Sequence, residues 1–289
     1  MKQSRYRSPN FPFPFATRPF HSPFILQFVP IALPASPCIW SHSKYCSIFD
    51  SIHYHQNISI MKTFLLITLI MHVISGTVAL TTGLLSMLNR KGGKNHLLTG
   101  KIFFWGMTGV FITAVTISIA KSLLFLFLVG FFSYYLTCSG YRSLYLKKLH
   151  QGQKAALIDW VIGYAGLFFG FGLIIYSIIG ISKNGGLFTI VPIIFGVISL
   201  FFAYADIRKF YIRPTGKSHW LVSHAMKMSG AFSATVTAFV VVNIQINQQW
   251  VLWILPAAII PTITRFQLKR MLSKSKTPVF RDARVISNS

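Results

Sequence analysis

The chain has 289 residues, of which 53% are hydrophobic and only 11% are charged. A soluble domain usually carries about a quarter charged residues, so this composition excludes an ordinary soluble protein. The 28 Lys and Arg residues face four acidic residues, all Asp, and the formal net charge is +24. Because the basic residues interrupt long apolar runs instead of sharing a polar surface, we predict a membrane protein with no nucleic-acid partner.

The first sixty residues differ from the rest of the chain. They hold eight of the 13 prolines and four of the nine histidines, and they show no helical or strand period. Proline at this density breaks helices and prevents a packed core. We therefore predict that residues 1–60 are a disordered or non-native leader and that Met61, where an apolar segment begins, is the native start.

From residue 61 onward the sequence is a series of apolar runs, each long enough to cross a hydrocarbon core of roughly 30 Å as a helix. The predicted spans are 63–88, 102–120, 122–145, 156–182, 187–205, 220–242 and 250–264. We predict an all-α, polytopic bundle of seven transmembrane helices over residues 61–266. A basic tail over residues 267–289 follows it.

Charges in the links between spans alternate. The links after the first, third and fifth spans carry four Lys or Arg residues each, whereas those after the second and fourth carry one each and that after the sixth carries none. The positive-inside rule then places the amino end outside and the carboxyl end in the cytoplasm. We expect a multi-pass protein of the inner cell membrane, with the lipid bilayer as its first partner.

One stretch of the first two spans has a recurrent pattern. His72, Gly76, Ala79 and Gly83 share one helical face, and His96 stands four residues before Gly100. The pattern H-x3-G-x2-A-L-x2-G, a short basic loop and H-x3-G-K resembles a bacterial family of multi-pass membrane proteins of unknown function. It is more loosely similar to small b-type cytochromes, in which paired histidines on neighbouring helices hold haem. The first resemblance implies a membrane location and a histidine-bearing core.

Ionisable side chains within membrane spans are hypotheses of function because their burial is costly. Neutral imidazoles that face inward from different helices suit haem iron or a proton relay. The candidate cofactor-binding residues are His72, His224, His96 and His219. The first hypothesis is b-type haem held chiefly by His72 and His224, with Lys227 or Arg142 balancing the propionates and electrons passing to a quinone or a redox partner.

Two alternatives remain open. In the second hypothesis the bundle is a proton-coupled transporter in which Asp159, Asp206 and Lys227 act with the histidines as a proton relay or solute site. In the third it is a noncatalytic membrane scaffold. The scarcity of acidic residues disfavours a cation carrier, since cation sites are usually lined by carboxylates. The three cysteines form no C-x-x-C pair, and we predict no metal site beyond haem.

Overall fold

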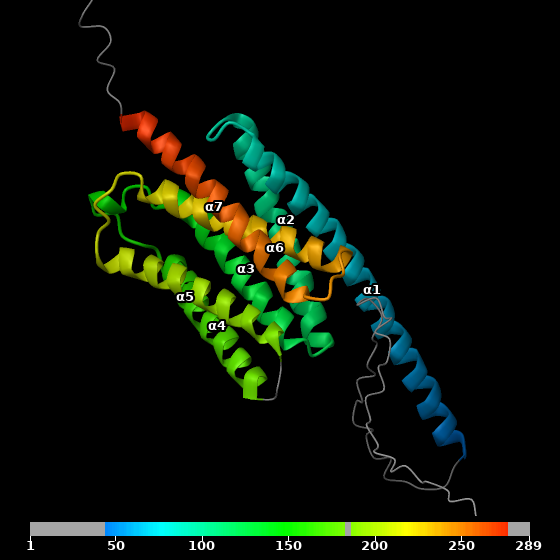
Figure 1. Ribbon diagram of the computed structural model, residues 1–289. Coiled ribbons are helices and arrows are strands. Elements are labelled where there is room, and N and C mark those ends of the chain that lie inside the picture. The colour runs from blue at the N-terminus through cyan, green and yellow to red at the C-terminus, as the bar shows by residue number, and fades with distance from the viewer. Residues whose placement is uncertain (1–43, 183–185, 277–289) are drawn as a thin grey trace, which may run out of the picture. The chain divides into compact units, whose positions relative to one another are not determined.

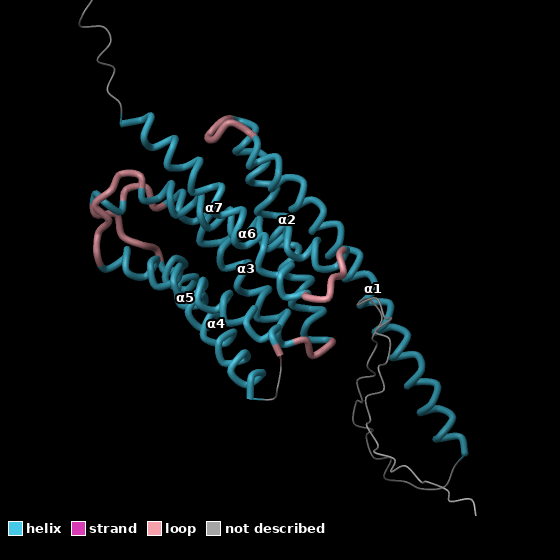
Figure 2. The backbone as a smooth tube through the Cα atoms, in the orientation of Figure 1, coloured by secondary structure: helices cyan, strands magenta, loops and turns pink. Residues whose placement is uncertain are grey.

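The computed structural model describes residues 44–182 and 186–276. This part of the chain contains helices and connecting turns and no strand (Figure 2). The main helices are α1 (Lys44–Leu88), α2 (Lys94–Ala120), α3 (Leu124–Arg142), α4 (Leu157–Ser182), α5 (Ile190–Tyr211), α6 (His219–Asn243) and α7 (Gln249–Lys276). Three short 3-10 helices, η1 (Ser143–Tyr145), η2 (Leu149–Gln151) and η3 (Leu187–Thr189), occupy the links.

Seven of the described helices are long and apolar enough to cross a membrane, which confirms the predicted helix bundle and its number of spans. The bounds differ most from the prediction at three places. The second span begins at Lys94, before the predicted start at residue 102. The fifth span extends to Tyr211 and the seventh to Ser273, beyond the predicted ends at residues 205 and 264. Helical hydrogen bonds continue past the last apolar residue, so hydropathy alone ends these helices too early.

The first helix also begins earlier than the predicted start of the membrane domain. Residues 44–60, assigned above to an irregular leader, are helical and continue into the first span. The physical reason is that no proline occurs between Pro37 and Pro192, so nothing interrupts the helix on this side. Likewise α7 continues through residue 276, within the predicted tail. The rest of the leader and of the tail lie outside the described residues.

Helix α3 lies at the centre of the packing and contacts α2, α4, α5 and α6 (Figure 1). The other closely packed pairs are α1 with α2, α4 with α5, and α6 with α7, and α6 also contacts α1. The small-residue face predicted on the first span forms the α1–α2 contact. A Cβ atom on Gly106 of α2 would lie 3.2 Å from the backbone nitrogen of Ala79, so a larger residue at position 106 would push the helices apart.

Glycines allow an equally close approach between α4 and α5. A Cβ atom on Gly196 would lie 2.9 Å from the carbonyl oxygen of Gly170, closer than two such atoms normally approach. A Cβ atom on Gly166 would lie 3.0 Å from the Cβ atom of Ala203. The Gly166 and Gly170 pair is therefore a helix-packing face, as small residues four apart are in many membrane bundles.

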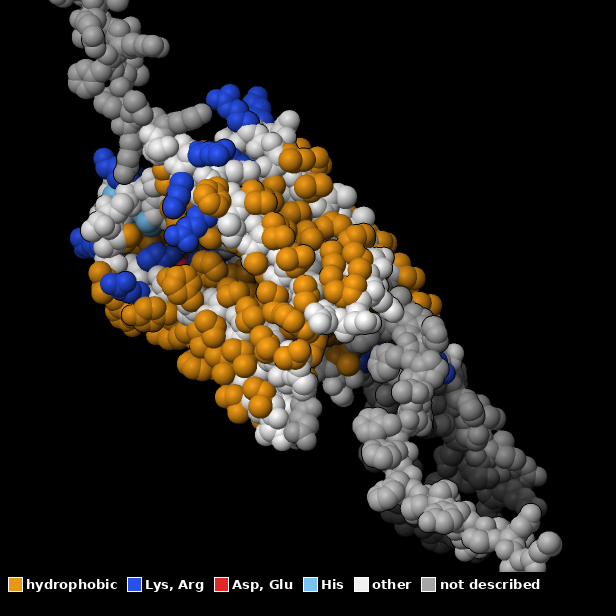
Figure 3. Space-filling view, in the orientation of Figure 1, with side chains coloured by type: hydrophobic (Ala, Val, Ile, Leu, Met, Phe, Trp, Pro, Cys, Tyr) orange, Lys and Arg blue, Asp and Glu red, His pale blue; other side chains and the backbone are white. Residues whose placement is uncertain are grey.

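The distribution of side chains is opposite to that of a soluble protein. Large apolar residues such as Trp105, Phe168 and Phe201 are exposed, whereas Thr137 and Ser199 are fully buried. Figure 3 shows an apolar flank with the Lys and Arg side chains gathered toward one end. We call this the basic end; the α1–α2, α3–α4 and α5–α6 links lie there. A lipid bilayer is the environment that suits such a surface.

Candidate functional site

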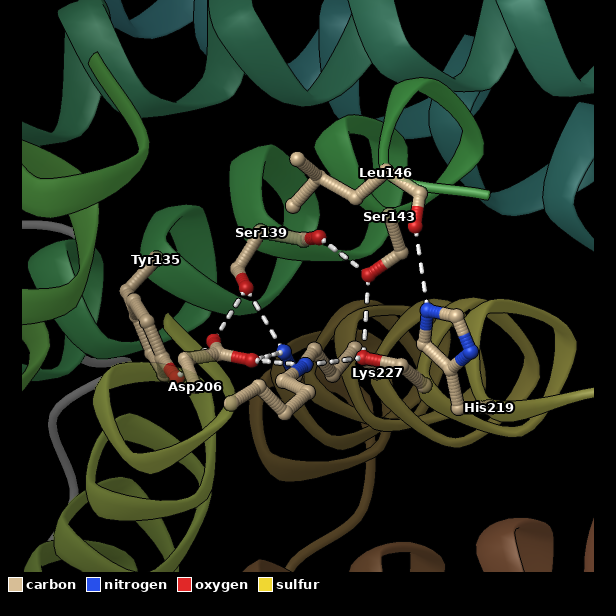
Figure 4. Close-up of polar contacts among 9 residues, drawn as sticks. Tyr135, Ser139, Ser143, Leu146, Asp206, His219 and Lys227 are labelled. Carbon is tan, nitrogen blue, oxygen red and sulfur yellow. Dashed lines mark hydrogen bonds and ion pairs between the residues drawn. The ribbon is translucent and has the colours of Figure 1, made fainter. Parts of the chain in front are cut away.

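Four helices bring polar residues together near the basic end of the bundle. Figure 4 shows those of α3, α5 and α6. On α3, Tyr135, Ser139 and Arg142 follow one another at steps of four and three, so they share one face of that helix. The last turns of α5 supply Asp206 and Lys209, the first turns of α6 supply Ser223 and Lys227, and the first turn of α4 supplies Asp159.

Asp206 is the centre of this arrangement and is 4% exposed. Its Oδ2 accepts hydrogen bonds from the Tyr135 hydroxyl at 2.9 Å and from Ser139 Oγ at 2.5 Å. Its Oδ1 pairs with Lys209 Nζ at 2.6 Å and with Lys227 Nζ. We call these five residues the Asp206 cluster. Both carboxylate oxygens are thus fully engaged by donors from three helices.

Lys227 is the most deeply buried charged residue described, with 1% of its surface exposed. Its Nζ also donates to Ser139 Oγ at 2.7 Å, so the ammonium group meets a hydroxyl and a carboxylate at once. On α3, Gly140 packs against Lys227, and a Cβ atom on this glycine would lie 3.2 Å from Lys227 Cβ. This close approach of α3 and α6 lets the lysine reach across to α5.

A second ion pair lies beside the cluster. Arg142 donates from Nε to Asp159 Oδ1 at 2.8 Å and from an Nη to Oδ2 at 3.1 Å, the two-bond geometry that fixes a carboxylate most firmly. Asp159 Oδ2 also accepts from the backbone nitrogen of Ala156 at 2.9 Å and so caps the first turn of α4.

Serine hydroxyls connect the cluster to the α6 surface. Ser143 Oγ lies 2.9 Å from the Ser139 carbonyl oxygen and 2.9 Å from Ser223 Oγ. Ser223 in turn accepts a hydrogen bond from Lys209 Nζ at 3.1 Å. Polar atoms therefore run without a break from buried Lys227, through Asp206, to Lys209, whose side chain is 20% exposed.

A small cavity lies between the two ion pairs. Its lining includes the polar residues Ser139, Arg142, Ser143, Asp159 and Asp206 and the apolar residues Leu146, Ile162 and Phe210. On the side away from the basic end, α3 and α6 meet tightly, because a Cβ atom on Gly230 would lie 3.1 Å from Leu136 Cδ1 and Leu136 is almost fully buried.

The histidines on α6 bind backbone carbonyl groups. His224 donates from Nδ1 to the Gly140 oxygen at 2.9 Å. Both ring nitrogens of His219 face carbonyl oxygens, Nδ1 that of Gly216 and Nε2 that of Leu146, each at 3.0 Å. His219 thereby ties the start of α6 to the α3–α4 link (Figure 4).

The other two predicted histidines lie between α1 and α2. His72 Nδ1 is 2.9 Å from Thr113 Oγ1. His96 donates from Nδ1 to the Ser86 carbonyl oxygen at 2.9 Å. The hydrogen bonds of these two rings join α1 and α2, whereas those of His224 and His219 join α6 to α3 and its link. His96 is nevertheless close enough to His224 for the two rings to interact electrostatically.

The predicted haem ligands His72 and His224 are not brought together. A Cβ atom on Gly83 of α1 would meet the Phe232 ring of α6, which fixes the level at which these oppositely directed helices cross. His72 stands eleven residues before Gly83 and His224 eight before Phe232, so at a rise of 1.5 Å per residue each lies at least roughly 12 Å from this level, on opposite sides. One haem does not span that distance between two axial ligands.

Within residues 44–182 and 186–276, no group of three or more His, Cys, Asp or Glu side chains is placed to hold a metal ion.

Comparison with known proteins adds nothing to the geometry. No family model, curated protein or solved structure matches the chain. The site is therefore interpreted from its own residues.

Sequence reasoning included Asp206, Lys227 and Asp159 but not Tyr135, Ser139 or Lys209. The steps of four and three on α3 were a usable signal, since they place polar groups on one face of an apolar helix. In the sequence, Lys209 is one of the four basic residues of the link after the fifth predicted span. Its spacing of three from Asp206 was the signal for a pair on one helix.

Proposed function

We propose that this protein is a proton-coupled transporter of a small solute, with the Asp206 cluster and the adjoining cavity as its solute and proton site. The observation that carries the proposal is the ion pair of Asp206 with Lys227, buried in a bundle of membrane-spanning helices. Apolar side chains of similar size often stabilise a core as well as a buried ion pair does, so packing alone gives no reason for these charges.

The hydrogen-bonded connections support proton movement. An ammonium, a carboxylate, a phenol and a hydroxyl in direct contact are groups that exchange protons when a solute changes the local charge. The connection from Lys227 through Asp206 to partly exposed Lys209 leads toward the basic end. By the positive-inside rule, the basic end faces the cytoplasm and the protein lies in the inner cell membrane. We therefore propose that the solute enters the site from the cytoplasmic side.

Proton-coupled uptake in proteoliposomes tests this function. The full chain is reconstituted with a pH-sensitive dye inside, and gradients of nitrate, alanine, glycerol or potassium are applied in turn. We expect at least one solute to move protons in the wild type, and Lys227→Met to abolish the response. Arg208→Gln is the matched control, because Arg208 is an exposed basic residue directly before Lys209 in the chain and outside the cluster. An unchanged response in Lys227→Met contradicts the proposal.

Haem-linked electron transfer to a quinone or redox partner has weaker support. It requires two axial histidines at one level, and the preferred pair, His72 and His224, lies on opposite sides of the Gly83–Phe232 level. The scaffold hypothesis also has weaker support, because a scaffold has no use for a buried lysine.

A further inference from the structure

Helices α2 and α6 are neighbours through their side chains and run in the same direction. Both begin at the basic end and lead away from it. The Thr235 hydroxyl of α6 donates to the Met107 sulfur of α2 at 3.2 Å. One turn nearer the basic end, the Phe103 and Phe232 rings meet edge to face with their centroids 6.4 Å apart. These two contacts fix the register of the two helices.

This register places two histidines opposite each other. His96 stands eleven residues before Met107, and His224 stands eleven residues before Thr235. Eleven residues make about three full helical turns, so each histidine lies on the contacting face of its helix and roughly 16 Å nearer the basic end. The two rings also interact electrostatically. His96 and His224 therefore face each other at one level of the bundle.

Hydrogen bonds leave the same nitrogen free on both rings. Nδ1 of His96 donates to the Ser86 carbonyl oxygen, and Nδ1 of His224 to that of Gly140, each at 2.9 Å. A carbonyl oxygen only accepts, so each neutral ring carries its proton on Nδ1 and a lone pair on Nε2. Among the described residues neither Nε2 atom has a hydrogen-bond partner, and both are accessible. Metal-ligating histidines almost always have their other nitrogen held in this way.

A second pair of histidines lacks this arrangement. The rings of His150 and His219 lie with their centroids 5.7 Å apart. Both nitrogens of His219 face carbonyl oxygens, however, so this pair offers at most one free nitrogen. Proximity of two rings is therefore not sufficient for a site, and His150 provides an internal control.

From the register and the two free nitrogens we propose that His96 and His224 form a two-histidine site for a transition-metal ion of the zinc, copper and nickel class. Imidazole is a preferred ligand of these ions, whereas Mg²⁺ and Ca²⁺ prefer oxygen. A Cβ atom on Gly83 of α1 would meet the Phe232 ring and lie 3.0 Å from the Phe103 ring. This packing closes the α2–α6 interface below the histidines and restricts the ligand to a single ion. The inference does not rest on the proposed transport.

Titration calorimetry of the purified full chain tests the site. The protein, without an affinity tag and freed of metal by a chelator, is titrated with Zn²⁺ and, as the control ion, with Mg²⁺. We expect only Zn²⁺ to bind. Loss of an outer-shell partner alone weakens metal affinity about 10- to 100-fold, so His96→Ala and His224→Ala should each weaken Zn²⁺ binding at least about tenfold. His150→Ala should bind like the wild type. Equal Zn²⁺ affinities in all four proteins overturn the proposal.

Electron paramagnetic resonance with Cu²⁺ separates ligation from a structural role. We expect hyperfine splitting from two nitrogen atoms in the wild type and from one in His96→Ala or His224→Ala. A spectrum that neither substitution changes overturns the assignment. A Soret band that His96→Ala abolishes shows a haem iron between the rings and overturns the proposal of a single free ion.

Cysteine replacement decides the question if the alanine variants do not fold. In a background without the three native cysteines, His96→Cys and His224→Cys are introduced together or singly, and the thiols are labelled with a maleimide. Cd²⁺ should protect both thiols in the double variant and neither thiol in the single variants. Unprotected thiols in the double variant show that the two positions do not face each other, and this result overturns the proposal.

Discussion

Asp206 and Lys227 form an ion pair between the end of α5 and the beginning of α6, and the lysine is nearly inaccessible to solvent. Lys209 contacts the same carboxylate oxygen from one turn further along α5. The carboxylate therefore has two cationic partners, whereas each cation has one carboxylate. Because of this asymmetry, we expect Asp206 and Lys227 to contribute differently to the stability of the folded protein.

Asp206→Asn should destabilise the protein more than Lys227→Met. The first change leaves two ammonium groups without a counterion, which costs about 3–5 kcal/mol for a buried charge, whereas the second leaves the Asp206–Lys209 pair intact. Unfolding of each variant in the same detergent measures the difference. The double variant should recover part of the loss caused by Asp206→Asn, since it removes one of the two unpaired cations. Equal losses in both single variants contradict this reading.

Gly196→Ala should destabilise the α4–α5 contact. The added methyl group would lie 2.9 Å from the Gly170 carbonyl oxygen, and overpacking of this kind costs about 1–3 kcal/mol. Gly216→Ala is the matched control, because a Cβ atom there meets nothing within 4 Å. Thermal unfolding of the two variants should show a lower Tm for the first alone, and similar Tm values would argue against close backbone packing.

The proposed orientation can be tested by labelling single cysteines. In a background without Cys38, Cys46 and Cys138, Lys154→Cys places a thiol in the α3–α4 link at the basic end, and Gln248→Cys places one in the α6–α7 link at the other end. Both positions are exposed. We expect a membrane-impermeant maleimide added to intact cells to label position 248 and to label position 154 only after lysis. The reverse pattern rejects cytoplasmic placement of the basic end.

Visible absorbance spectra test the haem hypothesis directly. Because His72 and His224 lie at different levels of the bundle, we expect no haem held between them after growth with excess haem precursor. His72→Ala should leave the spectrum unchanged. A Soret band that His72→Ala and His224→Ala each abolish would show that the two rings share a haem and that the helix arrangement differs from the one described.

The fold was predictable because a bilayer imposes simple rules on a sequence. A spanning helix must be long and apolar, and the charges of its links alternate, so seven runs of apolar residues indicate seven spans. The helix ends were less predictable, because residues such as Arg208 and Lys209 remain helical beyond the apolar run. The helix over residues 44–60 was also not predicted. The prolines of the first sixty residues all lie before residue 44, so they say nothing against a helix in this part.

The site was only half predictable. Asp206 and Lys227 stand out in the sequence because ionisable residues in apolar runs are rare. Their partners do not, since Tyr135 and Ser139 are common residues that reach Asp206 from 71 and 67 positions away. Contacts at such separations depend on how helices pack, which hydropathy does not encode. The predicted pairing of His72 and His224 failed for the same reason. The rise per residue gives the depth of a side chain along its own helix, but it does not give the level at which two helices cross.

The spacing of Asp206 and Lys209 on one helix has a consequence for membrane insertion. Spans enter the bilayer in chain order, and when α5 enters, Lys227 has not yet been inserted. Because the Asp206 carboxylate already has its partner three residues away, α5 carries a neutral pair into the lipid instead of an isolated acid. The second ammonium group arrives with α6, so the carboxylate gains its second cationic partner only when that hairpin closes.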